Sequence, residues 1–264
     1  MDDSIATKLL TLNHQFYQTF ADQFSATRMR LQPGVRRILE SLPPEASILD
    51  LGCGNGELAR ELARRGHRGP YLGLDFSAEL LEVAREGVAG HSNFAFSQAD
   101  LADSDWGGAV FSVQCSVFSL QSSLVGRQSS DFGLRSPFDV ILAFATLHHL
   151  PGRAIQRQTL MKIRSLLAPG GRFIHSNWQF LNSERLRARI QPWEEAGLAD
   201  TDVDPGDYLL DWRRGGYGLR YVHHFSESEL SSLAEETGFE IMETFYSDGE
   251  GGNLGLYQVW RLEN

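Results

Sequence analysis

The residues best suited to chemistry lie in one short stretch, ILDLGCGNG, at Ile48–Gly56. Asp50 stands near the end of an apolar run, and Gly52, Gly54 and Gly56 follow at alternate positions before a helical pattern begins. Glycines at this place let backbone N–H groups approach a ligand at the start of a helix. A phosphate, a nucleoside and a tight structural turn without a ligand would each produce this pattern.

The spacing of the glycines separates these ligands in part. The dinucleotide fingerprint G-x-G-x-x-G would need a glycine at Glu57, and a phosphate-binding loop would need Gly-Lys-Ser/Thr after the turn. Asp75 ends the next apolar run, YLGLD, where a carboxylate accepts hydrogen bonds from ribose hydroxyls. This carboxylate suits a nicotinamide dinucleotide equally well, but the glycine spacing favours a lone adenosyl group.

Strands and helices alternate around these residues. Apolar runs predict strands at 47–51, 71–75, 93–97, 138–144 and 171–178. Amphipathic runs predict helices at 57–65, 78–86 and 154–167. Such alternation is typical of an α/β, doubly wound, mostly parallel sheet with helices on both faces. Near the end of the chain Ser226 opens a helix, and a glycine-rich turn then joins two β-rich runs into a hairpin.

Three segments do not follow the alternation. Residues 1–42 predict two helices, residues 103–136 are rich in Ser, Gln and Gly, and residues 179–225 separate a strand from its returning helix. Insertions at the carboxyl ends of strands overhang the ligand crevice of a doubly wound sheet. We therefore expect one domain over 1–264, with a helical lid at 1–42, an insertion at 103–136 and a substrate-side insertion at 179–225.

Composition limits the classes of function. The net charge of −10 argues against a chain that coats nucleic acid indiscriminately. The two cysteines cannot form a disulfide framework, and the first residues lack the pattern of a signal peptide. No apolar run approaches the length of a membrane span. We expect a cytoplasmic protein without a membrane partner.

Five motifs then occur in order: ILDLGCGNG, LGLDFS, QADL, FDVILAFATLHHL and LLAPGGRFIHSNW. Together they resemble the class I S-adenosylmethionine-dependent methyltransferases over residues 46–178. The resemblance implies a Rossmann-like fold with a seven-stranded, mostly parallel sheet whose last strand is reversed, which agrees with the closing hairpin. It also implies S-adenosylmethionine as the cofactor.

The resemblance assigns residues to the cofactor. The methionine end would lie against Asp50 and the turn Gly52–Gly56, and the ribose against Asp75. Ala143 to Ala145 would line the sulfonium and the methyl group that is transferred.

The adenine ring would lie against Phe76, with Leu101 beside it, and Asp100 would accept a hydrogen bond from its amino group. Taken alone, Asp100 is also a common residue at the start of a loop.

The flanking segments resemble a narrower group, the transfer-RNA wobble-uridine methyltransferases, which esterify the carboxylate of 5-carboxymethyluridine. The resemblance implies tRNA as the acceptor and, as in eukaryotic members, a small zinc-containing activator subunit as a candidate partner. Segment 103–136 is longer than the pattern of this group. The matching positions are Tyr17, Phe24, Arg28, His148 or His149, Trp178, Arg220 and Tyr221.

The catalytic candidates depend on the acceptor. A carboxylate is already ionised at neutral pH and needs no general base. A protonated oxygen or nitrogen acceptor would need one, and His148 or His149 is the candidate. Arg28 and Arg220 would orient an acidic substrate through bidentate contacts, with Tyr221 beside Arg220. A small carboxylic acid or phenol remains an alternative acceptor.

Other interpretations remain open. Either histidine of the HHL motif is equally suited to packing, and His223–His224 suits a structural role before a helix. Trp212–Arg214 would stack on a base or form a solvated turn. No recognisable ligand spacing predicts a metal site. A nicotinamide-dependent oxidoreductase and a non-catalytic nucleoside-binding module are the alternatives from other classes.

Overall fold

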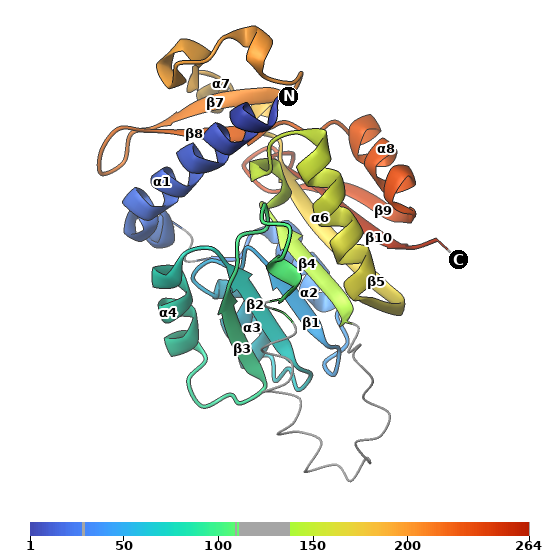
Figure 1. The fold of residues 1–264 in the computed structure, drawn as a ribbon. Helices are drawn as coiled ribbons and strands as arrows, with labels where there is room; N and C mark the ends of the chain where they lie inside the picture. Colours follow the sequence, from blue (N-terminus) through green and yellow to red (C-terminus); the bar gives the residue numbers. More distant parts are fainter. Residues whose placement is uncertain (28–29, 109, 111–137, 264) are drawn as a thin grey trace.

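A computed structural model describes residues 1–27, 30–108, 110 and 138–263. Its larger sheet has seven strands in the order β3-β2-β1-β4-β5-β10-β9, and β10 runs antiparallel to both of its neighbours, β5 and β9 (Figure 1). The strands are β1 Ile48–Leu51, β2 Tyr71–Asp75, β3 Phe94–Gln98, β4 Phe138–Phe144, β5 Leu167–Trp178, β9 Phe239–Ser247 and β10 Gly255–Leu262. The predicted fold class is confirmed, including the reversed last strand.

Helices cover both faces of this sheet, which explains why every residue of β1 and β2 is buried. One face packs against α2 Pro33–Glu40, α3 Glu57–Arg64 and α4 Ala78–Gly87. The other face packs against α6 Arg153–Leu166 and α8 Glu227–Thr237. Strand β1 lies between β2 and β4, where the strand order reverses, so the turn after β1 opens at the switch point of the sheet.

Residues 179–225 build a second, three-stranded antiparallel sheet in the order β6-β7-β8. Its strands are β6 Ile190–Gln191, β7 Asp207–Trp212 and β8 Gly218–His223, preceded by the short helix α7 Glu184–Arg187. Helix α1, Asp3–Thr27, is kinked at Phe20 and runs beside β8 (Figure 1).

Asn13 fastens α1 to β8. Its side-chain amide donates to the carbonyl oxygen of Tyr221 at 3.2 Å, and its Oδ1 accepts from the Tyr221 N–H at 2.8 Å. A buried amide thus satisfies a strand edge that would otherwise need another strand. We call α1 together with β6–β8 the roof.

The remaining predictions differ in their outcome. Ser226 caps α8, because its Oγ accepts from the Glu229 N–H at 3.2 Å, whereas the Glu229 carboxylate bonds elsewhere. Most of segment 103–136 lies outside the described residues. None of the helices in the described part of the chain is long and apolar enough to cross a membrane.

Candidate functional site

The glycine turn after β1 needs glycine for two reasons. Gly52, Gly54 and Gly56 have φ values of 71°, 55° and 76°, which L side chains rarely adopt. A Cβ at Gly52 would lie 2.5 Å from Thr146 Oγ1, and one at Gly56 would lie 2.7 Å from the Ala84 Cβ on α4. A Cβ at Gly54 would meet nothing within 4 Å, so its peptide faces open space. The turn is therefore shaped to bring backbone against a ligand.

Two cavities meet at this turn. The Arg220 cavity, about 380 Å³, reaches from Asp50 to the roof, and the Asp75 cavity, about 120 Å³, reaches towards Asp100. The wall that they share consists of Gly52, Gly54, Leu80, Phe144, Ala145 and His149. An elongated molecule with two chemically different ends fits this arrangement.

Asp50 lines the Arg220 cavity. It is buried, and its Oδ2 accepts from the Tyr71 hydroxyl at 2.6 Å. Burial raises the pKa of Asp50 to about 7, although the Tyr71 hydrogen bond opposes the shift. A cationic ligand group beside this carboxylate would restore its charge. The predicted contact with an amine at Asp50 is therefore chemically suitable.

Asp75 ends β2 in the Asp75 cavity. Its Oδ2 accepts from the Gly54 N–H at 2.8 Å, and its Oδ1 accepts from the Ser77 N–H at 3.0 Å. A carboxylate at the end of a strand at this place in a doubly wound sheet is suited to accept hydrogen bonds from ribose hydroxyls. The same carboxylate also holds the glycine turn in place.

His14 of α1 lines the Asp75 cavity near Asp100, and no pattern in the sequence indicated this residue. Asp100 forms an ion pair with His14 of α1, with Oδ2 and Nε2 3.1 Å apart. The His14 ring stacks on Phe76, with centroids 4.9 Å apart and planes at 24°. Leu101 is buried at the same cavity.

The alanines after β4 have different positions. Ala145 lines both cavities in a left-handed conformation, with φ of 53°, that a non-glycine residue adopts at an energetic cost. Hydrogen bonds from its N–H to the carbonyl and hydroxyl oxygens of Ser176 hold it there. Ala143 is fully buried in the core and lies outside the lining of both cavities.

The two predicted histidines face the cavities from a 3₁₀ turn. His149 lines both cavities, and its Nδ1 lies 3.3 Å from the carbonyl oxygen of Tyr221. Because a carbonyl only accepts, Nδ1 carries a proton, and Nε2 lies 2.7 Å from the Tyr17 hydroxyl. His148 is buried, and its Nδ1 accepts from the Trp178 N–H at 3.4 Å.

Arg220 enters its cavity from β8 without a carboxylate partner. Its side chain is buried, its Nε has no hydrogen-bond partner, and no ion pair joins it to another described residue. Three rings surround the guanidinium carbon, at 4.8 Å for Trp178, 5.5 Å for Phe16 and 5.9 Å for Trp212. An aromatic cage offsets part of the cost of burying this cation, and an anionic ligand would offset more.

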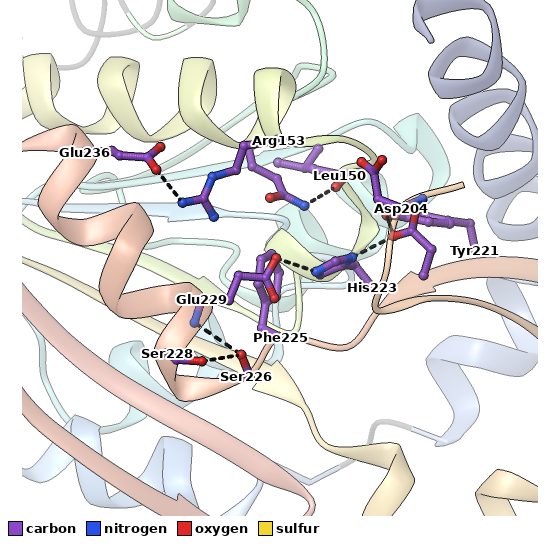
Figure 2. A network of polar contacts seen from close by, with 12 residues as sticks. Leu150, Arg153, Asp204, Tyr221, His223, Phe225, Ser226, Ser228, Glu229 and Glu236 are labelled. Carbon is purple, nitrogen blue, oxygen red and sulfur yellow. Dashed lines mark hydrogen bonds and ion pairs between the residues drawn. The ribbon is translucent and has the colours of Figure 1, made fainter. Parts of the chain in front are cut away.

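Tyr221 lies on the other side of β8 and lines neither cavity. It is fully buried, and its hydroxyl donates to Asp207 Oδ1 at 2.7 Å. His223 bonds the same carboxylate at 2.6 Å and Glu229 at 2.8 Å, a network that joins the roof to α8 (Figure 2). Burial would lower the pKa of His223, but these two carboxylates raise it to about 9. The structure gives Tyr221 a supporting position instead of one at the acceptor.

Several expectations stay outside this description. Arg28 and the Phe24 side chain lie beyond the described residues. Arg213 pairs with Asp211, and Trp212 donates to the carbonyl oxygen of Arg214, so two of these three side chains make contacts within the turn. Within the described chain, no three histidine, cysteine or carboxylate side chains gather as metal ligands would.

Comparison with known proteins agrees with this geometry. The sequence matches the Methyltransferase domain family over residues 24–244. It is 27% identical over 233 residues to a putative methyltransferase of Encephalitozoon cuniculi, covering 87% of this chain and 88% of that protein. It is 24% identical to the tRNA (carboxymethyluridine(34)-5-O)-methyltransferase of Schizosaccharomyces pombe, covering 88% and 90%.

A solved structure shares the fold. The 1,6-didemethyltoxoflavin-N1-methyltransferase of Burkholderia thailandensis, determined with S-adenosylhomocysteine, superimposes with a TM-score of 0.60 at 18% identity. The alignment covers 100% of this chain and 91% of that one. The chain belongs to the methyltransferase domain family and has the fold of its S-adenosylmethionine-dependent members.

Proposed function

We propose that this methyltransferase esterifies a carboxylate of its acceptor, with S-adenosylmethionine as methyl donor, and that the acceptor is a carboxymethylated uridine of tRNA. The bound donor supplies an activated methyl group on a sulfonium. The observation that carries the proposal is Arg220, a buried cation whose charge no described carboxylate balances. A substrate carboxylate in the Arg220 cavity would form an ion pair with Arg220 through bidentate hydrogen bonds.

The remaining residues agree with this acceptor. A carboxylate needs no general base, and both ring nitrogens of His149 already form hydrogen bonds, one with Tyr17 and one with the backbone of Tyr221. We assign the glycine turn and Asp50 to the methionine end of the donor, Asp75 to its ribose and Phe76 with Asp100 to its adenine. Alignment of nucleophile and methyl then contributes on the order of 7–11 kcal/mol of the barrier reduction.

The tRNA acceptor is supported by the Schizosaccharomyces pombe relative, whose name specifies carboxymethyluridine and which aligns over 90% of its length. The net charge of −10 favours a second candidate, a small carboxylic acid, because a polyanion gains little from an acidic protein. Both acceptors use Arg220 in the same way.

The test measures transfer of labelled methyl from S-adenosylmethionine to carboxymethyluridine-containing tRNA, to the free nucleoside and to a panel of small acids. We expect a methyl ester, which alkali hydrolyses to methanol, and a methyl product stable to alkali would refute carboxylate transfer. Nucleoside mass spectrometry of tRNA from a deletion strain then decides the acceptor, since an unchanged ester-uridine level excludes tRNA.

Arg220→Lys tests the residue that carries the proposal. Lysine keeps the charge but loses the planar fork, so we expect kcat/KM to fall roughly 100-fold with S-adenosylhomocysteine affinity unchanged. Arg213→Lys is the matched control, because Arg213 is an exposed arginine on the adjoining turn. Equal activity of both variants would contradict the assignment.

A further inference from the structure

At the adenine end of the cofactor site, a side chain of the protein occupies the two groups that would bind the base. Phe76 and Asp100 are the two groups that we assign to the adenine ring, one by stacking and one by accepting a hydrogen bond. In the structure His14 makes both contacts, since it stacks on Phe76 and bonds Asp100 through Nε2. An imidazole therefore reproduces the flat ring and the N–H donor of adenine.

The spacing leaves no room for both rings. The centroids of His14 and Phe76 are 4.9 Å apart, which is stacking distance for one pair of rings. An adenine inserted between them would need about twice that separation. An adenine ring can stack on this face of Phe76 only after His14 has left it.

We infer that His14 is a gate that competes with the adenine ring for Phe76 and Asp100, so that cofactor binding requires its displacement. The inference rests on the proposed placement of the cofactor. If a residue occupies the site in the free protein, the apparent association constant of the ligand is the intrinsic constant multiplied by the fraction of molecules in which the site is open.

The gate also responds to pH. The hydrogen bond from Asp100 raises the pKa of His14 above its usual value of 6.5. Burial would raise the pKa of Asp100, but its bonds to His14 and the Ala102 N–H lower it. The other titratable groups at this cavity are Tyr17, Asp75 and His149. The pair is complete below pH 6.5 and is lost as pH rises through the raised pKa, so competition is strongest in acid.

The probe should report the adenine end alone. Methylthioadenosine has the adenosyl group without the amino acid, so its binding does not depend on the charge of Asp50. We expect His14→Ala to bind it roughly 5- to 10-fold more tightly than the wild type at pH 6, from the loss of a stacked and ion-paired contact. Wild-type affinity should rise between pH 6 and pH 8, while that of His14→Ala should stay level.

Gln15→Ala is the matched control, because Gln15 is exposed on the same helix. His14→Gln keeps a polar side chain that does not titrate, and it should also remove the pH dependence. Weaker or unchanged binding of methylthioadenosine by both His14 variants would overturn the gate. Failure of every variant to bind S-adenosylhomocysteine would instead refute the cofactor site, so the two failures are distinguishable.

Discussion

The carboxyl ends of β1 and β2, which we call the edge, and the roof form their parts of the site from different chemical groups. The edge uses backbone at Gly52–Gly56 and a carboxylate, Asp50, whose pKa burial raises to about 7. The roof uses charged side chains in the interior, with Asp207 and His223 paired and Arg220 held among aromatic rings. The edge therefore binds a ligand through a local backbone turn. The structure of the roof instead depends on buried charged side chains whose partners are distant in the sequence.

The difference has an energetic consequence. A buried carboxylate that waits for a ligand destabilises the free protein, while a buried pair stabilises it only as long as both partners remain. Substitutions of equal size should therefore have opposite effects on the free energy of unfolding in the two regions.

The largest effect is expected at His223 in the roof. Replacement by glutamine in His223→Gln leaves Asp207 buried without its cation, which should lower the free energy of unfolding by about 3–5 kcal/mol. Denaturant titration measures this change. His91→Gln is the control, because His91 is exposed, and equal loss in both variants would contradict the buried pair.

The same histidine predicts how stability depends on pH. The folded pKa of about 9 lies above the usual 6.5, so the stabilisation is complete below pH 6.5 and is lost as pH rises through 9. The full loss is roughly 3 kcal/mol, and His223→Gln should remove this dependence. A wild-type stability that does not change over this interval would refute the pairing.

At the edge, Asp50→Asn should act in the opposite direction. Because the folded pKa of Asp50 is raised to about 7, the folded state is favoured in acid and loses stability as pH rises from about 4 through 7. Asparagine does not ionise and keeps a partner for Tyr71, so the variant should be more stable than the wild type at pH 8, by at most about 4 kcal/mol.

Binding should separate the two ends of the ligand. S-adenosylhomocysteine has an ammonium that we place at Asp50, so Asp50→Asn should bind it roughly 10-fold more weakly. Methylthioadenosine lacks this group and should bind unchanged, as calorimetry can show. Equal weakening of both ligands would place Asp50 elsewhere in the site.

The sequence could predict the edge because its signals are local. All three glycines of the turn have positive φ, and Gly52 and Gly56 also have neighbours that exclude a Cβ, so glycines stand at fixed spacing. Asp50 and Asp75 lie within or at the end of apolar strands, which periodicity detects. Parallel topology then brings the carboxyl ends of these strands together.

The sequence predicts the two segments that form the roof, but it could not predict their contacts, because these join distant residues. Asn13 bonds the backbone of Tyr221, and His14 bonds Asp100, without any spacing that a pattern in the sequence reveals. Arg220 and Tyr221 were predicted as a pair, but neighbouring residues of a strand point to opposite faces. Only Arg220 therefore reaches the cavity.

The smallest expected effect tests whether the two regions are coupled. Ser226 caps α8 through the Glu229 N–H at 3.2 Å, and Ser77 caps α4 through the Leu80 N–H at 3.2 Å. Replacing either serine with alanine should lower the free energy of unfolding by about 1 kcal/mol. Thermal unfolding at pH 7 measures both changes.

The two caps should differ in a second readout. Ser226→Ala frays the turn that presents Glu229 to His223, so the loss of stability between pH 6.5 and 9 should become smaller. Ser77→Ala acts at the cofactor edge, far along the chain from this network, and should leave that pH dependence intact. If both variants changed it equally, the roof and the edge would share one cooperative network, and the contrast between local backbone geometry and distant charge pairing would not hold.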